Sequence, residues 1–211
     1  MKPQKTMPKN EKKTEGKSVL STIEQYLQNK WFLFLFIPLA LILLFVYRDY
    51  ISMRQFFMFR DIGSDTITFN YPQYVCLSEY VRNIGVPGWS FQQGLGQNLY
   101  PLGPGDLFGN LLVFSGKENI PKMLIWIELL KIALIALVSY LYLQRIGLSK
   151  TVSIIGSFVV SFSGFVILGG TWYIFSTQAL YFMFMLYSLE CLMWGKYWFL
   201  FPVSVFVTAS Y

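Results

Sequence analysis

Two acidic residues stand where they could perform chemistry, in the segment RDIGSDTITFNYPQY at residues 60–74. Asp61 and Asp65 follow an apolar run closely, so we expect them at the outer surface of a membrane. A carboxylate there can act as a general base that takes the proton of an attacking hydroxyl. The adjacent Arg60 can hold a phosphate, because guanidinium pairs with phosphate oxygens in a bidentate manner. The competing interpretation is structural, with Asp65 capping a short helix over residues 66–69.

A second pair of charged residues lies inside an apolar stretch. Glu128 and Lys131 are three residues apart, so on a helix they share a face and neutralise each other. Ionisable groups within a membrane span usually face a protein interior or a water-filled cavity. Two hypotheses follow. The pair locks helices together, or Lys131 faces a cavity and binds the phosphate of a lipid substrate.

The loop after the first apolar run is rich in side chains of the kind that bind sugars. Gln73 offers hydrogen bonds, and Trp89 offers an aromatic face. Structural roles compete here too, because Gln is ordinary in turns and Trp89 could anchor the loop at the membrane interface. Asp106 is predicted to cap the turn PGDLFGNLL.

Several kinds of site are excluded or unsupported. The chain has no histidine, which rules out a His-based zinc site, a Ser-His-Asp triad and a Cys-His pair within it. Cys76 and Cys191 are expected near opposite faces of the bilayer, too far apart for a disulfide. Asp61 and Asp65 could supply oxygen ligands to Mg²⁺ or Mn²⁺. Nothing in the sequence requires a metal, so no cofactor is predicted.

The composition indicates a membrane protein. Hydrophobic residues make up 55% of the chain and charged residues only 13%, against about 25% charged in an ordinary soluble domain. The net charge is +6, and seven of the 17 lysines and arginines precede the first apolar run. Such a basic tail is typical of the cytoplasmic side. The lipid bilayer is therefore a predicted partner, and nucleic acid is not.

The predicted fold class is all-α, a polytopic bundle of transmembrane helices with a long, partly helical first extracytoplasmic loop. The predicted segments are a disordered cytoplasmic tail at 1–17, an amphipathic interfacial helix at 18–30, a signal anchor spanning the membrane at 31–47, the outer loop at 48–120, and further spans at 121–145, 151–169, 172–194 and 197–211. The last segment is short for a span, so we expect a truncated chain. Arg145 and Lys150 lie in a short inner loop, as the positive-inside rule requires.

Several stretches together resemble a known family. An N-terminal signal anchor, an outer loop opening with DIGSD and NYPQY, the segment VPGWSFQQGLGQN and a helix reading ELLKIALIALVSYLYLQRIG are similar to the start of the YfhO-type bacterial membrane protein family. That family is related to the GT-C superfamily of glycosyltransferases, which use polyprenyl-phosphate-linked sugars. The resemblance covers about residues 31–211. It implies a longer, multi-helix enzyme whose catalytic acid lies in the first outer loop, carried here by Asp65 with Asp61 as the reserve. Lys131 matches a lysine of the family's helix pattern.

The predicted function is therefore transfer of a sugar from a polyprenyl-phosphate carrier to an extracytoplasmic cell-wall polymer such as lipoteichoic acid. The predicted location is the bacterial cell membrane, with several spans and a cytoplasmic N-terminus. The main alternative is a transporter or lipid flippase, in which Glu128 and Lys131 line a translocation path. A non-catalytic membrane scaffold is the third. A transferase would need Asp65 and tolerate neutralisation of the Glu128–Lys131 pair better, whereas a transporter would show the reverse.

Overall fold

The computed structural model describes residues 19–61, 63–85, 88–91, 94–98, 106–169 and 172–211, with the side chains of residues 19–29 and of Gln97 excepted. The tail predicted to be disordered, residues 1–17, lies outside these residues, as do residues 170 and 171 between the spans predicted at 151–169 and 172–194. The side chains that would test the predicted amphipathic surface helix also lie outside them.

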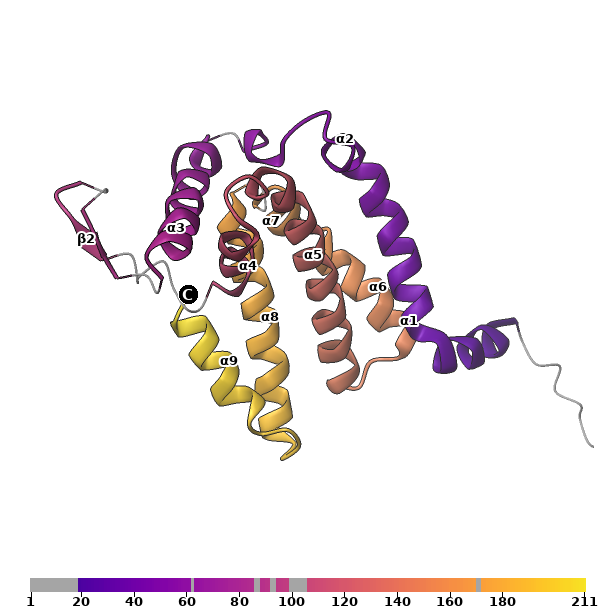
Figure 1. The fold of residues 1–211 in the computed structure, drawn as a ribbon. Coiled ribbons are helices and arrows are strands. Elements are labelled where there is room, and N and C mark those ends of the chain that lie inside the picture. The colour runs from indigo at the N-terminus through magenta and orange to yellow at the C-terminus, as the bar shows by residue number, and fades with distance from the viewer. Residues whose placement is uncertain (1–18, 62, 86–87, 92–93, 99–105, 170–171) are drawn as a thin grey trace, which may run out of the picture.

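The described chain is mostly helical (Figure 1). Its helices are α1 (Val19–Val46), α2 (Arg48–Ile51), the 3-10 turn η1 (Phe57–Phe59), the π-helical turn η2 (Thr66–Asn70), α3 (Tyr71–Asn83), α4 (Leu107–Ser115), α5 (Ile120–Arg145), α6 (Lys150–Ser161), α7 (Gly164–Ile167), α8 (Tyr173–Met193) and α9 (Leu200–Ala209). Two short strands, β1 (Trp89–Ser90) and β2 (Gln97–Asn98), pair antiparallel. The all-α class is confirmed.

Helix α1 is interrupted where the sequence changes from polar to apolar. Lys30 has non-helical backbone angles, with φ −129° and ψ 25°, and the apolar part of the helix follows it. Leu35, Leu39 and Leu43 recur every fourth residue, share one face of this part and are buried. The other faces expose large apolar side chains such as Leu41 and Phe45. Exposed apolar surface of this kind is typical of membrane contact.

Helix α5 is the centre of the bundle. It packs against α8 and α6, and also contacts α1, α3 and α4. Its 26 residues extend about 39 Å at 1.5 Å per residue, more than the ~30 Å of a bilayer's hydrocarbon core. Among the described residues it is the one helix both long and apolar enough to cross a membrane, and the shorter apolar helices are Lys30–Val46, Lys150–Ser161 and Leu200–Ala209. The multi-spanning bundle therefore stays a prediction.

The segment predicted as one span at 151–169 forms two helices. Helix α6 ends at Ser161, and α7 begins after Ser163, whose hydroxyl accepts a hydrogen bond from the backbone N–H of Val166 at 3.4 Å. Ser residues favour helix starts because the hydroxyl satisfies a backbone N–H that the helix leaves unpaired. Along α6, Ser153 and Ser157 are fully buried, and α6 packs on α5 and α1.

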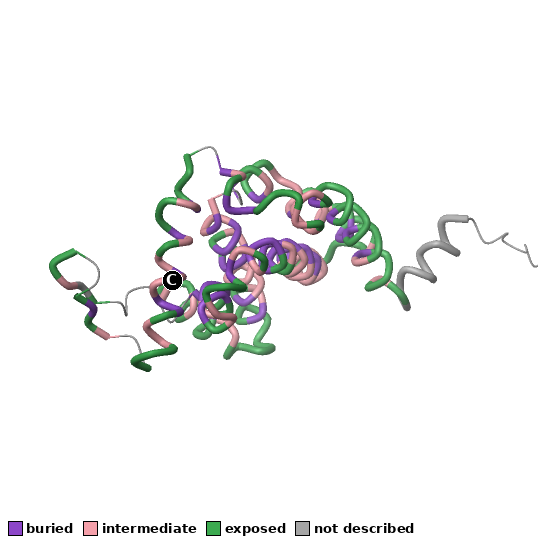
Figure 2. The backbone as a smooth tube through the Cα atoms, turned by 45° about the horizontal axis from the view of Figure 1, so that its top comes forward, coloured by how far each residue is buried: buried purple, intermediate pink, exposed green. Residues whose placement is uncertain are grey.

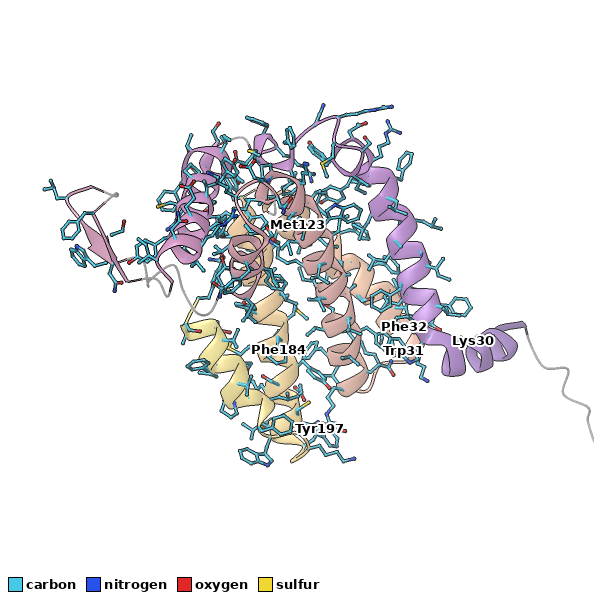
Figure 3. All side chains as sticks on the ribbon, viewed as in Figure 1. Lys30, Trp31, Phe32, Met123, Phe184 and Tyr197 are labelled. Carbon is cyan, nitrogen blue, oxygen red and sulfur yellow. The ribbon has the colours of Figure 1, made fainter. Side chains whose placement is uncertain are left out.

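The helices alternate in direction, which gathers the connecting segments at two ends (Figure 1). At one end lie α2, α3, α7 and the starts of α5 and α8. At the opposite end, Lys30 and Tyr197 mark the start of the apolar part of α1 and the α8–α9 turn (Figure 3). Burial is greatest in the interior of this arrangement, whereas the outer faces of α1 and most described residues of the β1–β2 segment are exposed at its edges (Figure 2). The outer loop predicted at 48–120 therefore covers one end of the bundle.

Candidate active site

A pocket of about 850 Å³ lies beside Asp65. Residues from four elements line it: η2 with the first turn of α3, the N-terminal cap of α4, the first turns of α8, and the C-terminal Tyr211. Its volume is in the range typical of small-molecule sites. The pocket brings residues of the predicted outer loop against a helix that follows about a hundred residues later, so only the folded chain assembles it.

Asp65 contributes an exposed carboxylate to this pocket. It occupies the N-cap position of η2, but its side chain makes no capping hydrogen bond. The Oδ2 atom of Asp61 instead accepts a hydrogen bond from the backbone N–H of Thr66 at 2.6 Å. The capping role considered for Asp65 therefore belongs to Asp61, which is only 7% exposed and does not line the pocket.

The backbone around Asp65 is unusual in two respects. Ser64 has a φ of +60°, a left-handed conformation that is uncommon for residues other than glycine. The next turn, η2, is a π-helix, and single π-helical turns are frequent at functional sites. Strain of this kind persists where the surrounding structure imposes it. The left-handed residue and the π-helical turn lie directly before and after Asp65, so they set the backbone conformation that positions its side chain.

Asp106 also lines the pocket, and it has the capping role predicted for it. Its Oδ1 atom accepts from the backbone N–H of Gly109 at 2.8 Å, and its Oδ2 atom accepts from the hydroxyl of Tyr74 at 2.9 Å. Burial, and then the Asp106 carboxylate, raise the pKa of Tyr74 well above its ordinary value. Tyr74 therefore stays protonated and donates, tying α3 to the start of α4.

Two glycines allow this close packing. A Cβ on Gly109 would overlap the Asp106 carboxylate and lie 2.8 Å from Tyr74 Cε1. A Cβ on Gly63 would lie 2.9 Å from Trp172 Nε1 and 3.5 Å from Asp65 Oδ2. Contacts this short essentially do not occur in packed proteins, where interiors are as dense as organic crystals. Gly63 thus lets the start of α8 approach Asp65.

The remaining predicted site residues are divided between the pocket and other places. Gln73 lines the pocket with Asp65. Arg60 does not; its guanidinium carbon lies 4.8 Å from the Tyr47 ring centroid, among aromatic rings at the end of α1. Trp89 lies on β1, 55% exposed, and its carbonyl accepts from the hydroxyl of Tyr80 at 3.3 Å. It is not among the pocket residues.

Lys131 and Glu128 form a fully buried ion pair at the interface of α5 and α8. The Lys131 Nζ atom lies 2.8 Å from Glu128 Oε2 and donates to the carbonyl of Tyr173 at 2.7 Å. It also lies 3.6 Å from the centroid of the Tyr173 ring. The hydroxyl of Ser176 donates to Glu128 Oε2 at 2.8 Å. Lys131 is 0% exposed and does not line the pocket. Because the pair lies on α5 and its hydrogen bonds reach Tyr173 and Ser176 of α8, this geometry matches the hypothesis that the pair locks helices together.

A model of a protein family, described as "Bacterial membrane protein YfhO", matches residues 33–209. The chain belongs to this family. The resemblance seen in the sequence is thereby confirmed, and so is membrane localisation. No curated protein and no solved structure matches the chain.

The family match includes every described pocket residue except Tyr211. Of the residues that line the pocket, the sequence predicted Asp65 and Gln73 as site residues. It did not predict that Asp106, Trp172 and Gln178 line the same pocket. The sequence predicted Asp106 only as a helix cap. Gln178 gave a weak signal, as an amide in an otherwise apolar run.

The cysteines Cys76 and Cys191 are both free, and the part of the chain that the structure describes contains no cluster of three or more acidic or Cys side chains suited to a metal.

Proposed function

We propose that this chain carries the acceptor-activating part of a membrane glycosyltransferase that uses a polyprenyl-phosphate-linked sugar. One observation carries the proposal. The carboxylate of Asp65 is exposed in a pocket of about 850 Å³ and does not cap the turn that it precedes. Membership of the YfhO family supports it, because that family resembles the GT-C glycosyltransferases. A carboxylate without a structural role in such a pocket is a candidate for proton transfer.

The reaction assigns one task to Asp65. A hydroxyl of the acceptor attacks the anomeric carbon, a new C–O bond forms, and the bond from that carbon to the phosphate oxygen breaks. Asp65 takes the hydroxyl proton, and the polyprenyl phosphate leaves with the bonding electrons. The carboxylate must be within hydrogen-bond reach of the hydroxyl, which requires the acceptor to enter the pocket.

The basic residues of the short connections support an outward-facing site, whereas the arginines and lysines of the longer segment at residues 48–122 set orientation only weakly. Arg145 ends α5, Lys150 begins α6, and Lys196 lies in the α8–α9 turn. These points and Lys30 lie at the end of the bundle opposite to the start of α8, which borders the pocket (Figures 1 and 3). Basic residues near the ends of spans favour the cytoplasmic side. The multi-spanning arrangement that we propose therefore exposes the pocket outside the cell, where a wall polymer such as lipoteichoic acid is accessible.

The buried Glu128–Lys131 pair favours a second candidate, a transporter or lipid flippase. Ionisable residues inside a span commonly mark a translocation path. An experiment on the full-length protein in membrane vesicles separates the two. Transfer of radiolabelled sugar from lipid carrier to polymer, and flipping of the labelled lipid, are measured for Asp65→Asn and for the double variant Glu128→Gln/Lys131→Met.

The glycosyltransferase predicts that Asp65→Asn abolishes transfer and that the double variant retains it. Loss of flipping in the double variant, with Asp65→Asn unaffected in both assays, would establish the transporter instead. A scaffold without catalysis would tolerate both changes.

A further inference from the structure

We infer that the pocket beside Asp65 binds the uncharged saccharide of the donor and excludes its phosphate. This inference rests on the proposed function and specifies which part of the substrate the site takes. It departs from the expectation that a loop arginine or Lys131 would hold the phosphate within the site.

The charge of the pocket excludes an anion. Among the described residues that line it, two are carboxylates and none is a lysine or arginine. The residues in this part of the chain that the structure does not describe (62, 86–87, 92–93, 99–105 and 170–171) also contain no lysine or arginine. Lys131 is held by Glu128 and fully buried, and Arg60 lies against Tyr47. Among the charged side chains that line the pocket, a phosphate would meet only the carboxylates of Asp65 and Asp106, which repel an anion.

The polar groups of the pocket match the hydroxyls of a sugar. Three amide side chains line it: Asn70, Gln73 and Gln178. An amide offers two donors and an acceptor on one planar group, and each sugar hydroxyl can donate and accept. Asn70 and Gln73 come from η2 and the first turn of α3, whereas Gln178 comes from α8. The amides therefore approach a ligand from both walls.

The apolar part of the pocket suits the same ligand. Phe69, Trp172 and Phe175 line it, and the rings of Trp172 and Phe175 meet edge to face with centroids 5.5 Å apart. Aromatic side chains provide rigid apolar surface, on which the C–H face of a sugar ring can lie. A few placed polar groups within a largely apolar lining are the usual composition of a site for a small organic ligand.

One feature of the pocket would favour phosphate, so the experiment must separate the two ligands. The start of α8 borders the site, and helix N-termini attract anions. The probes are farnesyl phosphate and farnesyl phosphate carrying glucose, galactose or N-acetylglucosamine. Their affinities are measured for the full-length protein in lipid nanodiscs, in the parent and in Gln178→Ala and Gln73→Ala. Gln55→Ala, an exposed glutamine outside this pocket, is the matched control.

The inference predicts that one or more of the glycosylated lipids binds more tightly than farnesyl phosphate to the parent. Gln178→Ala should weaken that ligand about tenfold, the loss of roughly one well-placed hydrogen bond, while farnesyl phosphate changes less than twofold. Equal losses for both ligands would place the phosphate in the pocket and overturn the inference. So would a sugar that adds nothing to affinity in the parent.

The transfer assay judges the proposed function separately. Suppose that sugar transfer depends on Asp65 while Gln178→Ala weakens both ligands equally or neither. That result would support the proposed glycosyltransferase and contradict the inference about the saccharide. A sugar-specific effect without transfer would do the opposite, and would indicate that a sugar-bearing lipid is bound but not used as a donor.

Discussion

The Oδ2 atom of Asp61 accepts a hydrogen bond from the backbone N–H of Thr66 at 2.6 Å. This bond caps η2 from a residue that lies five positions upstream, rather than from the N-cap residue itself. It leaves Asp65, at the N-cap position, without a capping role. Two aspartates that are four residues apart therefore differ in the structure: Asp61 caps the turn, and Asp65 lines the pocket without a capping hydrogen bond.

Replacing Asp61 should lower stability more than activity. Asp61→Ala removes the cap and should cost roughly 1–2 kcal/mol, the usual effect of deleting a helix-capping side chain. Asp61→Asn keeps an acceptor oxygen and should cost less. Thermal unfolding of the purified protein measures both. An Asp61→Ala variant as stable as the parent would show that the Thr66 amide does not depend on this carboxylate.

The contact of Tyr74 with Asp106 depends on the absence of a side chain at Gly109. Gly109→Ala should disrupt it and lower the melting temperature, because the new Cβ would overlap the Asp106 carboxylate. Gly164→Ala is the matched control, since a Cβ there meets nothing within 4 Å and alanine is the better helix former. A similar melting temperature for the two variants would contradict the packing described for Gly109.

The Glu128–Lys131 pair should be more costly to break than to remove. Lys131→Met leaves the Glu128 carboxylate buried without its partner, which typically costs about 3–5 kcal/mol. The double variant Glu128→Gln/Lys131→Met removes both charges and should recover much of that loss. Stability and the KM for the lipid donor are measured together. A raised KM in Lys131→Met, with stability intact, would instead favour a direct contact with the donor phosphate.

Gly63 should affect activity through Trp172. A Cβ at this position would lie 2.9 Å from Trp172 Nε1, so Gly63→Ala should displace the Trp172 indole, which lines the pocket, and lower sugar transfer. Gly88→Ala is the control in the same loop, because its nearest contact would be the Tyr80 hydroxyl at 3.9 Å. Equal transfer rates in the two variants would show that the spacing at Gly63 has no bearing on the site.

The sequence predicted the helices from the lengths of their apolar runs. Helix α5 begins and ends within one residue of the predicted 121–145, and α8 within one residue of 172–194. The break between α6 and α7 was not predicted, because residues 151–169 are uncharged throughout and a single hydroxyl, that of Ser163, starts the second helix. The apolar composition of a segment does not indicate where a single capping hydroxyl ends one helix and starts the next.

The site was predicted in part. The outer loop and Asp65 followed from the position of acids beside an apolar run. The capping of η2 by Asp61 in place of Asp65 was not predicted, and the left-handed backbone of Ser64 between them is uncommon for a serine, so the residue type did not indicate it. Trp172 and Gln178 reach the pocket through tertiary packing of α8 against the outer loop, which no local pattern encodes.

The measurement that tests the account most directly is the rate of sugar transfer by Asp65→Asn and Asp61→Asn in the full-length protein. Both changes replace a carboxylate by an amide of the same shape, four residues apart. Radiolabelled sugar is followed from the polyprenyl carrier into polymer at saturating donor. The account predicts that kcat falls by at least a hundredfold in Asp65→Asn, the lower end of what a general base contributes, and stays within a few-fold of the parent in Asp61→Asn. Transfer by Asp65→Asn at the parental rate would contradict it.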